Sequence, residues 1–254
     1  MDYHRPLSPE ESRRMSLVTG IMWLITFATS IPALWLYQPV LDDPVGYVAG
    51  AGHDNRIFFA CFLELLLIIS NIATAVIPYP LLKRQHEGCA LGFVTARIME
   101  CTFILVGILS VLTVVGLRTD PPAGVSQDTI GSLAYTFAAV KDWTFLLGPG
   151  FVVGVGNGLL FGYLMYTSGL VPPRMALLGL IGGPLLIASG VAVMFGVDQP
   201  GGTLQSLCTI PEALWELLVG IYFTFKGFRQ QAPILRGELP VDRLAASPTV
   251  VPAR

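Results

Sequence analysis

Residues 89–117 read CALGFVTARIMECTFILVGILSVLTVVGL, a long apolar segment with one arginine and one glutamate near its middle. Arg97 and Glu100 are three residues apart, so one turn of helix places both side chains on the same face. The segment is long enough to cross the roughly 30 Å hydrocarbon core of a bilayer. Ionisable side chains at that depth are costly and usually face the interior of a helix bundle. The stretch therefore predicts a membrane helix whose charged face is sheltered by other helices.

The composition of the whole chain also indicates a membrane protein. Of the 254 residues, 53% are hydrophobic and 13% are charged, whereas about 25% of the residues in a typical soluble domain are charged. The formal net charge is −2 and the basic residues are scattered along the chain. Nucleic acid is therefore not expected as a partner, because a nucleic-acid site needs a clustered basic patch.

Six apolar segments predict an all-α, polytopic transmembrane helix bundle, with residues 1–229 forming a single membrane domain. The predicted spans are residues 16–37, 56–82, 89–117, 150–167, 175–197 and 210–225. Residues 128–145 are apolar on average but include Lys141 and Asp142, and we interpret them as one interfacial helix before the fourth span. Residues 230–254 are rich in proline, alanine and arginine, which is typical of a disordered cytoplasmic tail.

The basic residues predict the orientation of this bundle. With both termini in the cytoplasm, most of the 15 lysine and arginine residues lie inside, and only Arg56, Arg118 and Lys141 lie outside. This asymmetry follows the positive-inside rule. If residues 128–145 formed a seventh span, the basic end of the last span would face outside, so six spans are preferred. The expected location is the plasma membrane.

Polar residues recur at similar depths in several predicted spans. At a rise of about 1.5 Å per residue, the residues nearest the midplane are Asn71, Arg97, Glu100, Asn157 and Glu216. Glu64 and Glu212 lie one or two turns further out, where they either join this group or reach interfacial water. These side chains converge if the second, third, fourth and sixth spans are neighbours.

The charges of this predicted group do not balance, because four glutamates accompany one arginine. Arg97 stays charged and neutralises one carboxylate, either Glu100 or Glu216. A further carboxylate holds a proton, faces a water-filled cavity or binds a cation. Three interpretations stay open: an ion pair that fixes helix register, a ligand or proton pathway, and a catalytic site that uses paired carboxylates as acid and base.

Two other features carry weaker predictions. Lys141 and Asp142 are either a solvated helix end or a gate for an outward opening of the cavity. Glycines recur at every fourth position of the fourth span, at Gly150, Gly154, Gly158 and Gly162. Such a stripe of small residues lets helix backbones approach closely, so we interpret it as a packing surface.

Metal and cofactor sites are not expected. The four cysteines form no C-x-x-C pair, and the three histidines lie outside the apolar segments. Structural zinc and haem sites need clustered ligands of these types.

Short motifs along the chain match those of one membrane family. They include Ala96-Arg97 with Glu100, Lys141-Asp142-Trp143 with Gly148-Pro149, Tyr163-Leu164-Met165-Tyr166, and Pro211 with Glu216. On these motifs the chain resembles the bacterial integral membrane family of the domain of unknown function DUF4386. Two positions depart from the family pattern: the turn at Pro172 has an extra proline, and Lys141 replaces a frequent histidine. The resemblance implies a multi-span fold and draws attention to Arg97, Glu100 and Glu216, but it implies no activity.

Three hypotheses of function follow. The leading one is binding or transport of a small or lipid-like molecule at Arg97, Glu100 and Glu216, with Asn71 and Asn157 lining the pocket. The alternative is a structural or regulatory membrane partner without a ligand, in which the glycine stripe mediates helix association. This alternative is compatible with a homo-oligomer. The third is an intramembrane enzyme, which ranks last because no nucleophile–base–orienter set is visible in the sequence.

Overall fold

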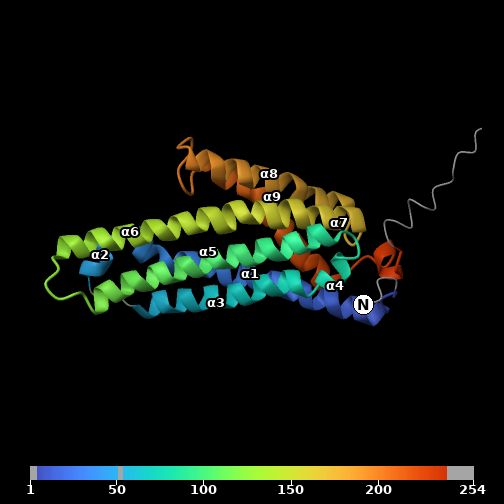
Figure 1. Ribbon diagram of the computed structural model, residues 1–254, viewed down its shortest axis with the longest axis horizontal. Coiled ribbons are helices and arrows are strands. Elements are labelled where there is room, and N and C mark those ends of the chain that lie inside the picture. The colour runs from blue at the N-terminus through green and yellow to red at the C-terminus, as the bar shows by residue number, and fades with distance from the viewer. Residues whose placement is uncertain (1–4, 51–53, 239–254) are drawn as a thin grey trace, which may run out of the picture.

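The computed structural model describes residues 5–50 and 54–238, which form helices and turns without a strand. The long helices are α1 (Pro9–Leu41), α3 (Asp54–Val76), α5 (Glu87–Thr119), α6 (Gln127–Phe145), α8 (Pro173–Met194) and α9 (Thr203–Phe225). The short elements are α2 (Pro44–Ala49), α4 (Tyr79–Leu82), α7 (Gly162–Ser168), the π-helical segments η1 (Leu146–Val152) and η2 (Gly154–Phe161), and the 3₁₀ turn η3 (Pro233–Arg236). Figure 1 shows the long helices running side by side along the molecule.

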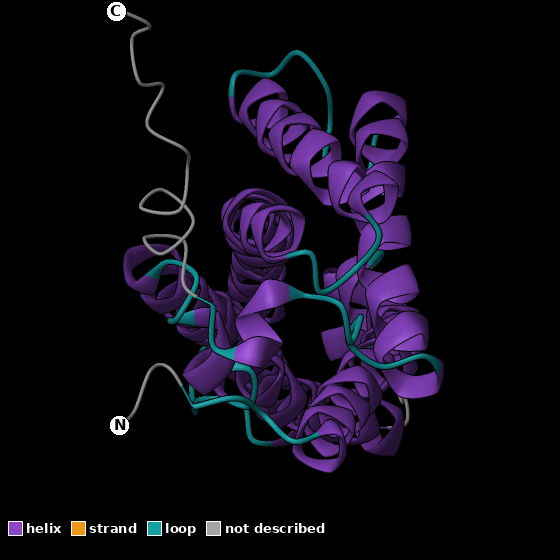
Figure 2. Cartoon of the chain, turned by 90° about the vertical axis from the view of Figure 1, so that its right-hand side faces the viewer, coloured by secondary structure: helices purple, strands orange, loops and turns teal. Residues whose placement is uncertain are grey.

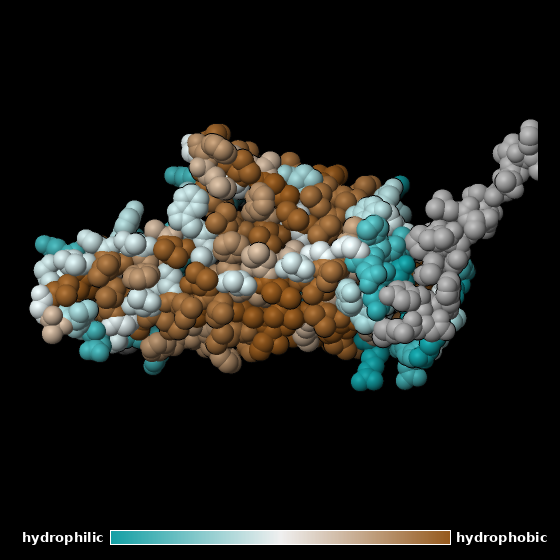
Figure 3. Space-filling model, in the orientation of Figure 1, coloured by the Kyte–Doolittle hydropathy of each residue, from teal (hydrophilic) through white to brown (hydrophobic). Residues whose placement is uncertain are grey.

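Six helical segments are long and apolar enough to cross a membrane, which confirms the predicted number of spans. They are Pro9–Leu41, Asp54–Leu82, Glu87–Thr119, Gln127–Ser168, Pro173–Met194 and Thr203–Phe225. Apolar residues dominate the middle of the surface in Figure 3, and polar residues gather at both ends. The protein is a multi-pass helical membrane protein.

The fourth span differs from the predicted arrangement. The helix expected at residues 128–145 is present, but it is not separate: α6 continues through η1 and η2 into α7. In η1, the backbone N–H of Val153 donates to the carbonyl oxygen of Gly148, five residues earlier, as in a π-helix. Proline crowds the preceding turn of an α-helix, and the wider turns of η1 accommodate Pro149. Lys141 and Asp142, on which the interpretation as a separate interfacial helix rested, therefore lie inside one long helix.

The helices differ in length, so the two ends of the bundle are built differently. Helix α5 has 33 residues and is about 50 Å long, whereas α8 and α9, with 22 and 23 residues, match the thickness of a bilayer. Figure 1 shows α5 and α6 extending past the α8–α9 hairpin, with α2 beside them at that end. The described part of the connection between α1 and α3 and the connection between α5 and α6 therefore lie beyond the end of the α8–α9 hairpin.

Three polar residues tie the loops together at this extended end. Nη1 of Arg118 lies 2.6 Å from Oδ1 of Asp54, and the hydroxyl of Tyr47 donates to the same oxygen at 2.5 Å. The guanidinium of Arg118 also lies 4.9 Å from the centre of the Tyr47 ring. Burial and the hydrogen bond to Asp54 raise the pKa of Tyr47 to about 12, so its hydroxyl is a donor at neutral pH.

Two apolar cores lie one after the other along the bundle. The core near the chain ends includes the aromatic side chains of Trp23, Phe93, Phe161, Trp215 and Phe223. The other core is mostly aliphatic and includes Val40, Ile57, Ile104, Val111 and Ile130. On α5, Arg97 and Glu100 fall between Phe93 of the first core and Ile104 of the second. The buried charges therefore occupy the boundary between the two cores.

The segment after α9 differs from the predicted disordered tail in its first nine residues, 230–238. Ile234 and Leu235 are buried in the core near the chain ends. The backbone N–H of Leu7 donates to the carbonyl oxygen of Leu235 at 2.9 Å, so both described ends of the chain meet. Figure 2 looks onto this end of the bundle, where loops connect the helices. Residues 239–254 of the predicted tail lie outside the described residues.

Glycines of the fourth span bring its backbone close to α8. A Cβ atom on Gly154 would lie 2.7 Å from the carbonyl oxygen of Gly183, and one on Gly162 would lie 3.3 Å from the backbone of α8. A Cβ atom on Gly158 would overlap Cα of Gly183. Gly150, also in the predicted stripe, lies against atoms of its own helix instead. Residues four apart do not stay aligned in the wider turns of a π-helix.

Substituting Gly183→Ala is expected to lower the free energy of unfolding by about 1–3 kcal/mol through overpacking. The added methyl group would lie 2.5 Å from the carbonyl oxygen of Gly154. Gly116→Ala on α5 is the matched control, because a Cβ atom there meets nothing within 4 Å. The control should be neutral or stabilising, by at most about 1 kcal/mol. Thermal unfolding in detergent micelles compares the two variants, and equal melting temperatures would contradict this close packing.

Candidate functional site

Arg97 is the centre of a polar network between α3 and α5. Its Nη1 donates to Oε2 of Glu100 at 2.7 Å, and its Nε donates to Oγ1 of Thr74 at 3.2 Å. The other carboxylate oxygen of Glu100 accepts a hydrogen bond from Nδ2 of Asn71 at 2.9 Å. The guanidinium carbon lies 4.5 Å from the centre of the Trp23 ring on α1. Arg97 is 2% exposed, and its Nη2 has no hydrogen-bond partner among the described residues.

The helical spacing explains how this network forms. Asn71 and Thr74 are three residues apart on α3, and Arg97 and Glu100 are three residues apart on α5, so each pair occupies one helix face. The two faces meet where α3 and α5 pack together. Thr74 also donates to the backbone carbonyl of Asn71 at 2.6 Å, which leaves its oxygen free to accept from Arg97.

Two more glutamates lie one turn apart on α9. Glu216 accepts a hydrogen bond from Nδ2 of Asn157. The indole nitrogen of Trp215 donates to the backbone carbonyl of Asn157 at 3.0 Å, which ties α9 to η2. Glu212 is 2% exposed, and neither of its carboxyl oxygens has a hydrogen-bond partner among the described residues. A Cβ atom on Gly182 would lie 2.8 Å from Oε2 of Glu212, so α8 leaves room for this side chain only because glycine is there.

A second buried ion pair joins α3 to α6. Nζ of Lys141 lies 2.6 Å and 2.7 Å from the two carboxylate oxygens of Glu64. The hydroxyl of Tyr37 donates to Oε2 of Glu64 at 2.8 Å, and the ammonium group lies 4.6 Å from the centre of the same tyrosine ring. A Cβ atom on Gly107 would lie 2.9 Å from Cδ of Lys141, so this glycine on α5 gives the lysine its path into the bundle.

The two polar clusters share one cavity of about 300 Å³. Its polar walls are formed by Glu64, Asn71, Arg97, Glu100 and Glu216. Apolar side chains of α1, α3, α5, α9 and the fourth span cover the remaining walls, among them Phe27, Ile31, Leu67, Ile104 and Val153. The cavity therefore combines ionisable groups at one part of its surface with a predominantly apolar lining.

The mouth of this cavity lies between α1 and the fourth and sixth spans. α1 and α9 are in close contact at Gly220, where a Cβ atom would lie 3.1 Å from that of Trp23. Further along α1, Ile31 and Leu34 line the cavity and are 51% and 38% exposed, and Phe145 opposite them is 42% exposed. These are lipid-facing positions in a membrane protein, so the cavity opens toward the side of the bundle.

The charges around the cavity do not balance. Among the described residues here, the cations Arg97 and Lys141 accompany the carboxyl groups of Glu64, Glu100, Glu212 and Glu216. Each cation is within hydrogen-bond distance of one glutamate, which leaves Glu212 and Glu216 without a salt bridge. Buried uncompensated charge is costly, so protons or a bound cation must neutralise this pair, or water must solvate it.

The structure brings most of the predicted site residues together and separates a few. Asn157 reaches the group through Glu216, while Glu212 lies behind the cavity wall, one turn along α9. The two predicted gating residues point in different directions: Lys141 is buried against Glu64, and Asp142 is exposed. The interpretation of this pair as a solvated helix end therefore does not apply to Lys141.

Several partners of these residues were absent from the predicted set. Trp23, Tyr37 and Thr74 each contact a buried charge. Trp23 and Tyr37 are fully buried, whereas the nearby Trp35 is 68% exposed. The spacing of Thr74 from Asn71 is the one sequence signal that points to the network, because it places both on the face that meets α5.

In the part of the chain that the structure describes, no group of three or more histidine, cysteine, aspartate or glutamate side chains is placed to hold a metal ion.

Comparison with known proteins identifies the family of this chain. Neither a curated protein nor a solved structure matches the chain. A family model does match, over residues 18–227, which include most of the first span, all of the other five and every residue of the cavity wall. The chain therefore belongs to the family of the domain of unknown function DUF4386.

Proposed function

We propose that the protein binds or transports a small or lipid-like molecule in the cavity at Arg97, Glu100 and Glu216. The observation that carries this proposal is the combination of an apolar, side-opening cavity with buried ionisable groups that lack full compensation. Ionisable groups inside a membrane domain commonly mark substrate or proton pathways. A molecule with a polar head and an apolar body fits such a cavity.

The chemistry of the site suggests how the molecule is held. Its polar head lies near Glu216, whose carboxyl group receives a hydrogen bond from Asn157 but forms no salt bridge. Its apolar body lies along Phe27, Ile31 and Val153. A proton or a cationic head at Glu216 would restore the charge balance, so binding is expected to be linked to proton exchange at this residue.

The orientation and location in the cell belong to the same proposal. The end that holds both described termini carries many of the basic residues, among them Arg13, Arg14, Lys83, Arg84, Arg174 and Lys226. By the positive-inside rule this end faces the cytoplasm. We infer that the protein resides in the plasma membrane with its extended end, at α2 and Arg118, outside.

Filling the cavity tests the proposal. Native mass spectrometry of the purified protein should detect a co-purifying molecule with the wild type, and Ala213→Phe should lose it because residue 213 lines the cavity. Leu214→Phe is the matched control, because the neighbouring Leu214 is 46% exposed and is not part of the wall. A wild type without a bound molecule, or equal occupancy in both variants, would overturn the proposal.

Glu216→Gln tests the proposed proton exchange. The amide keeps the size of the side chain but removes its charge, so the co-purifying molecule is expected to bind about tenfold more weakly, a change of about 1.4 kcal/mol. The pH dependence of its retention should also become flatter. Both are measured by titrating the molecule back onto the emptied protein at several pH values. Retention that varies with pH as in the wild type would exclude Glu216 as the exchanging group.

A further inference from the structure

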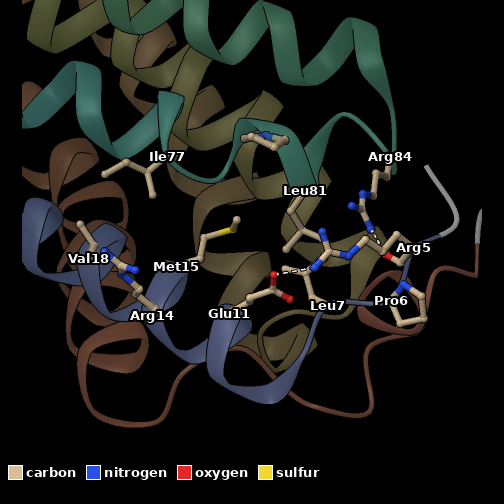
Figure 4. A pocket seen from close by; sticks show the side chains of 11 residues that line it. Arg5, Pro6, Leu7, Glu11, Arg14, Met15, Val18, Ile77, Leu81 and Arg84 are labelled. Carbon is tan, nitrogen blue, oxygen red and sulfur yellow. Dashed lines mark hydrogen bonds and ion pairs between the residues drawn. The ribbon is translucent and has the colours of Figure 1, made fainter. Parts of the chain in front are cut away.

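A second cavity, of about 400 Å³, lies at the end of the bundle that holds both described termini. It is formed by the start of α1, the segment before it, and the turn around α4 that follows α3. Figure 4 shows arginines at two sides of an apolar floor, with Arg14 beside Val18 on α1 and Arg84 beside Arg5 at the other side. This pocket is separate from the central cavity and shares no lining residue with it.

The rim of this pocket carries uncompensated positive charge. Arg5 pairs with Glu11 at 2.8 Å, so these two charges cancel. Nη1 of Arg84 donates to the backbone carbonyl of Arg5 at 2.7 Å, but no carboxylate pairs with Arg84 among the described residues. Arg14 is exposed and forms no hydrogen bond or ion pair with any described residue. Two guanidinium groups are therefore available to an anion at the pocket.

The floor of the pocket is apolar. Leu7, Met15, Val18, Ile77 and Leu81 line it. A free phosphate needs only the charged rim, whereas a lipid presents an anionic headgroup and an acyl chain together. Basic pockets between transmembrane helices on the cytoplasmic side are suited to anionic lipid headgroups.

We propose that this pocket binds an anionic phospholipid of the surrounding leaflet. The headgroup phosphate lies over the pocket, attracted by Arg14 and Arg84, and the first part of an acyl chain contacts Met15, Val18 and Ile77. The occupant is a membrane lipid because the pocket lies where α1 begins and α3 ends, at the level of the headgroups. Binding there ties the start of α1 to the turn that follows α3.

Native mass spectrometry with two defined lipids tests this site. Dioleoylphosphatidylglycerol and dioleoylphosphatidylcholine, which differ in net charge, are titrated separately onto the full chain in detergent. The wild type should prefer phosphatidylglycerol. Arg14→Gln and Arg84→Gln should each weaken phosphatidylglycerol binding about fivefold and leave phosphatidylcholine binding unchanged. Arg174→Gln is the matched control, because Arg174 is an exposed arginine at the same end but outside the pocket.

Two further results decide the source of the anion and the role of the floor. Val18→Trp fills the apolar part of the pocket and should reduce phosphatidylglycerol binding although all arginines remain. Glycerol 1-phosphate, which carries the anion without acyl chains, should compete poorly. The proposal is overturned if the double variant Arg14→Gln/Arg84→Gln binds phosphatidylglycerol as the wild type does. It is also overturned if glycerol 1-phosphate competes as well as the lipid, which would indicate a site for a free anion.

Discussion

Arg97→Met is expected to lower the free energy of unfolding by about 3–5 kcal/mol, the usual cost of removing one partner from a buried ion pair. The variant leaves the carboxylate of Glu100 buried with only the amide of Asn71 as a donor. It also removes the hydrogen bond to Thr74 and the contact of the guanidinium with Trp23. Thermal or urea unfolding in detergent micelles measures the loss.

The double variant Arg97→Met/Glu100→Leu separates the two roles that this pair can have. Replacing a buried ion pair by apolar residues of similar size is often neutral, so the double variant should recover most of the stability. If the pair only fixes helix register, the double variant keeps the co-purifying molecule. If the pair belongs to the proposed binding site, the stable double variant loses it. A single variant as stable as the wild type would contradict the network described for Arg97.

The spans were predictable because each depends on its own composition and length. The third is an example: residues 89–117 were predicted, and α5 extends over Glu87–Thr119. The continuity of the fourth span was not predictable in this way. By residue type alone, Lys141 favours a helix that leaves the membrane and Pro149 favours a helix break. The sequence around each residue does not show what prevents this. Glu64 on α3 neutralises the lysine, and a local change to π-helical turns accommodates the proline.

The ionisable residues of the candidate site could be identified from the sequence, but their pairings and their uncharged partners, such as Trp23 and Tyr37, could not. Depth along each helix correctly placed Arg97, Glu100 and Asn71 at one level, because helical rise is constant. Which carboxylate pairs with which cation depends on the rotation of each helix about its axis, and that rotation is set by packing between helices. Glu64 therefore pairs with Lys141, from a segment predicted to lie at the interface.

Helix rotation also explains why Glu212 and Glu216 have different surroundings although they are one turn apart. Glu216 reaches the cavity and Asn157, whereas Glu212 is held against the glycines of α8. If the central cavity exchanges protons, Glu216 is the group in contact with a ligand, and Glu212 is a buried neighbour whose charge state affects it. This division of roles follows from the close approach of α8 to η2 and α9.

Lys141→Met is the second substitution with a large expected effect, again about 3–5 kcal/mol of lost stability. Glu64 would keep the hydrogen bond from Tyr37 but lose both contacts to the ammonium group. Asp142→Asn is the matched control, because this exposed neighbour should change stability by at most about 0.5 kcal/mol. The same unfolding measurement in detergent compares the two variants.

The outcome also decides whether Lys141 acts as a gate. A gate must open, so its ion pair must break during each cycle, and separating two buried charges is costly unless water or a ligand compensates them. If Lys141→Met/Glu64→Leu is as stable as the wild type and still retains the co-purifying molecule, the pair holds α6 against α3 and does not gate the cavity. If the stable double variant instead gains or loses the molecule much faster than the wild type, the pair controls access. Glu64, the member of the pair that lines the cavity, then marks the route by which the ligand enters.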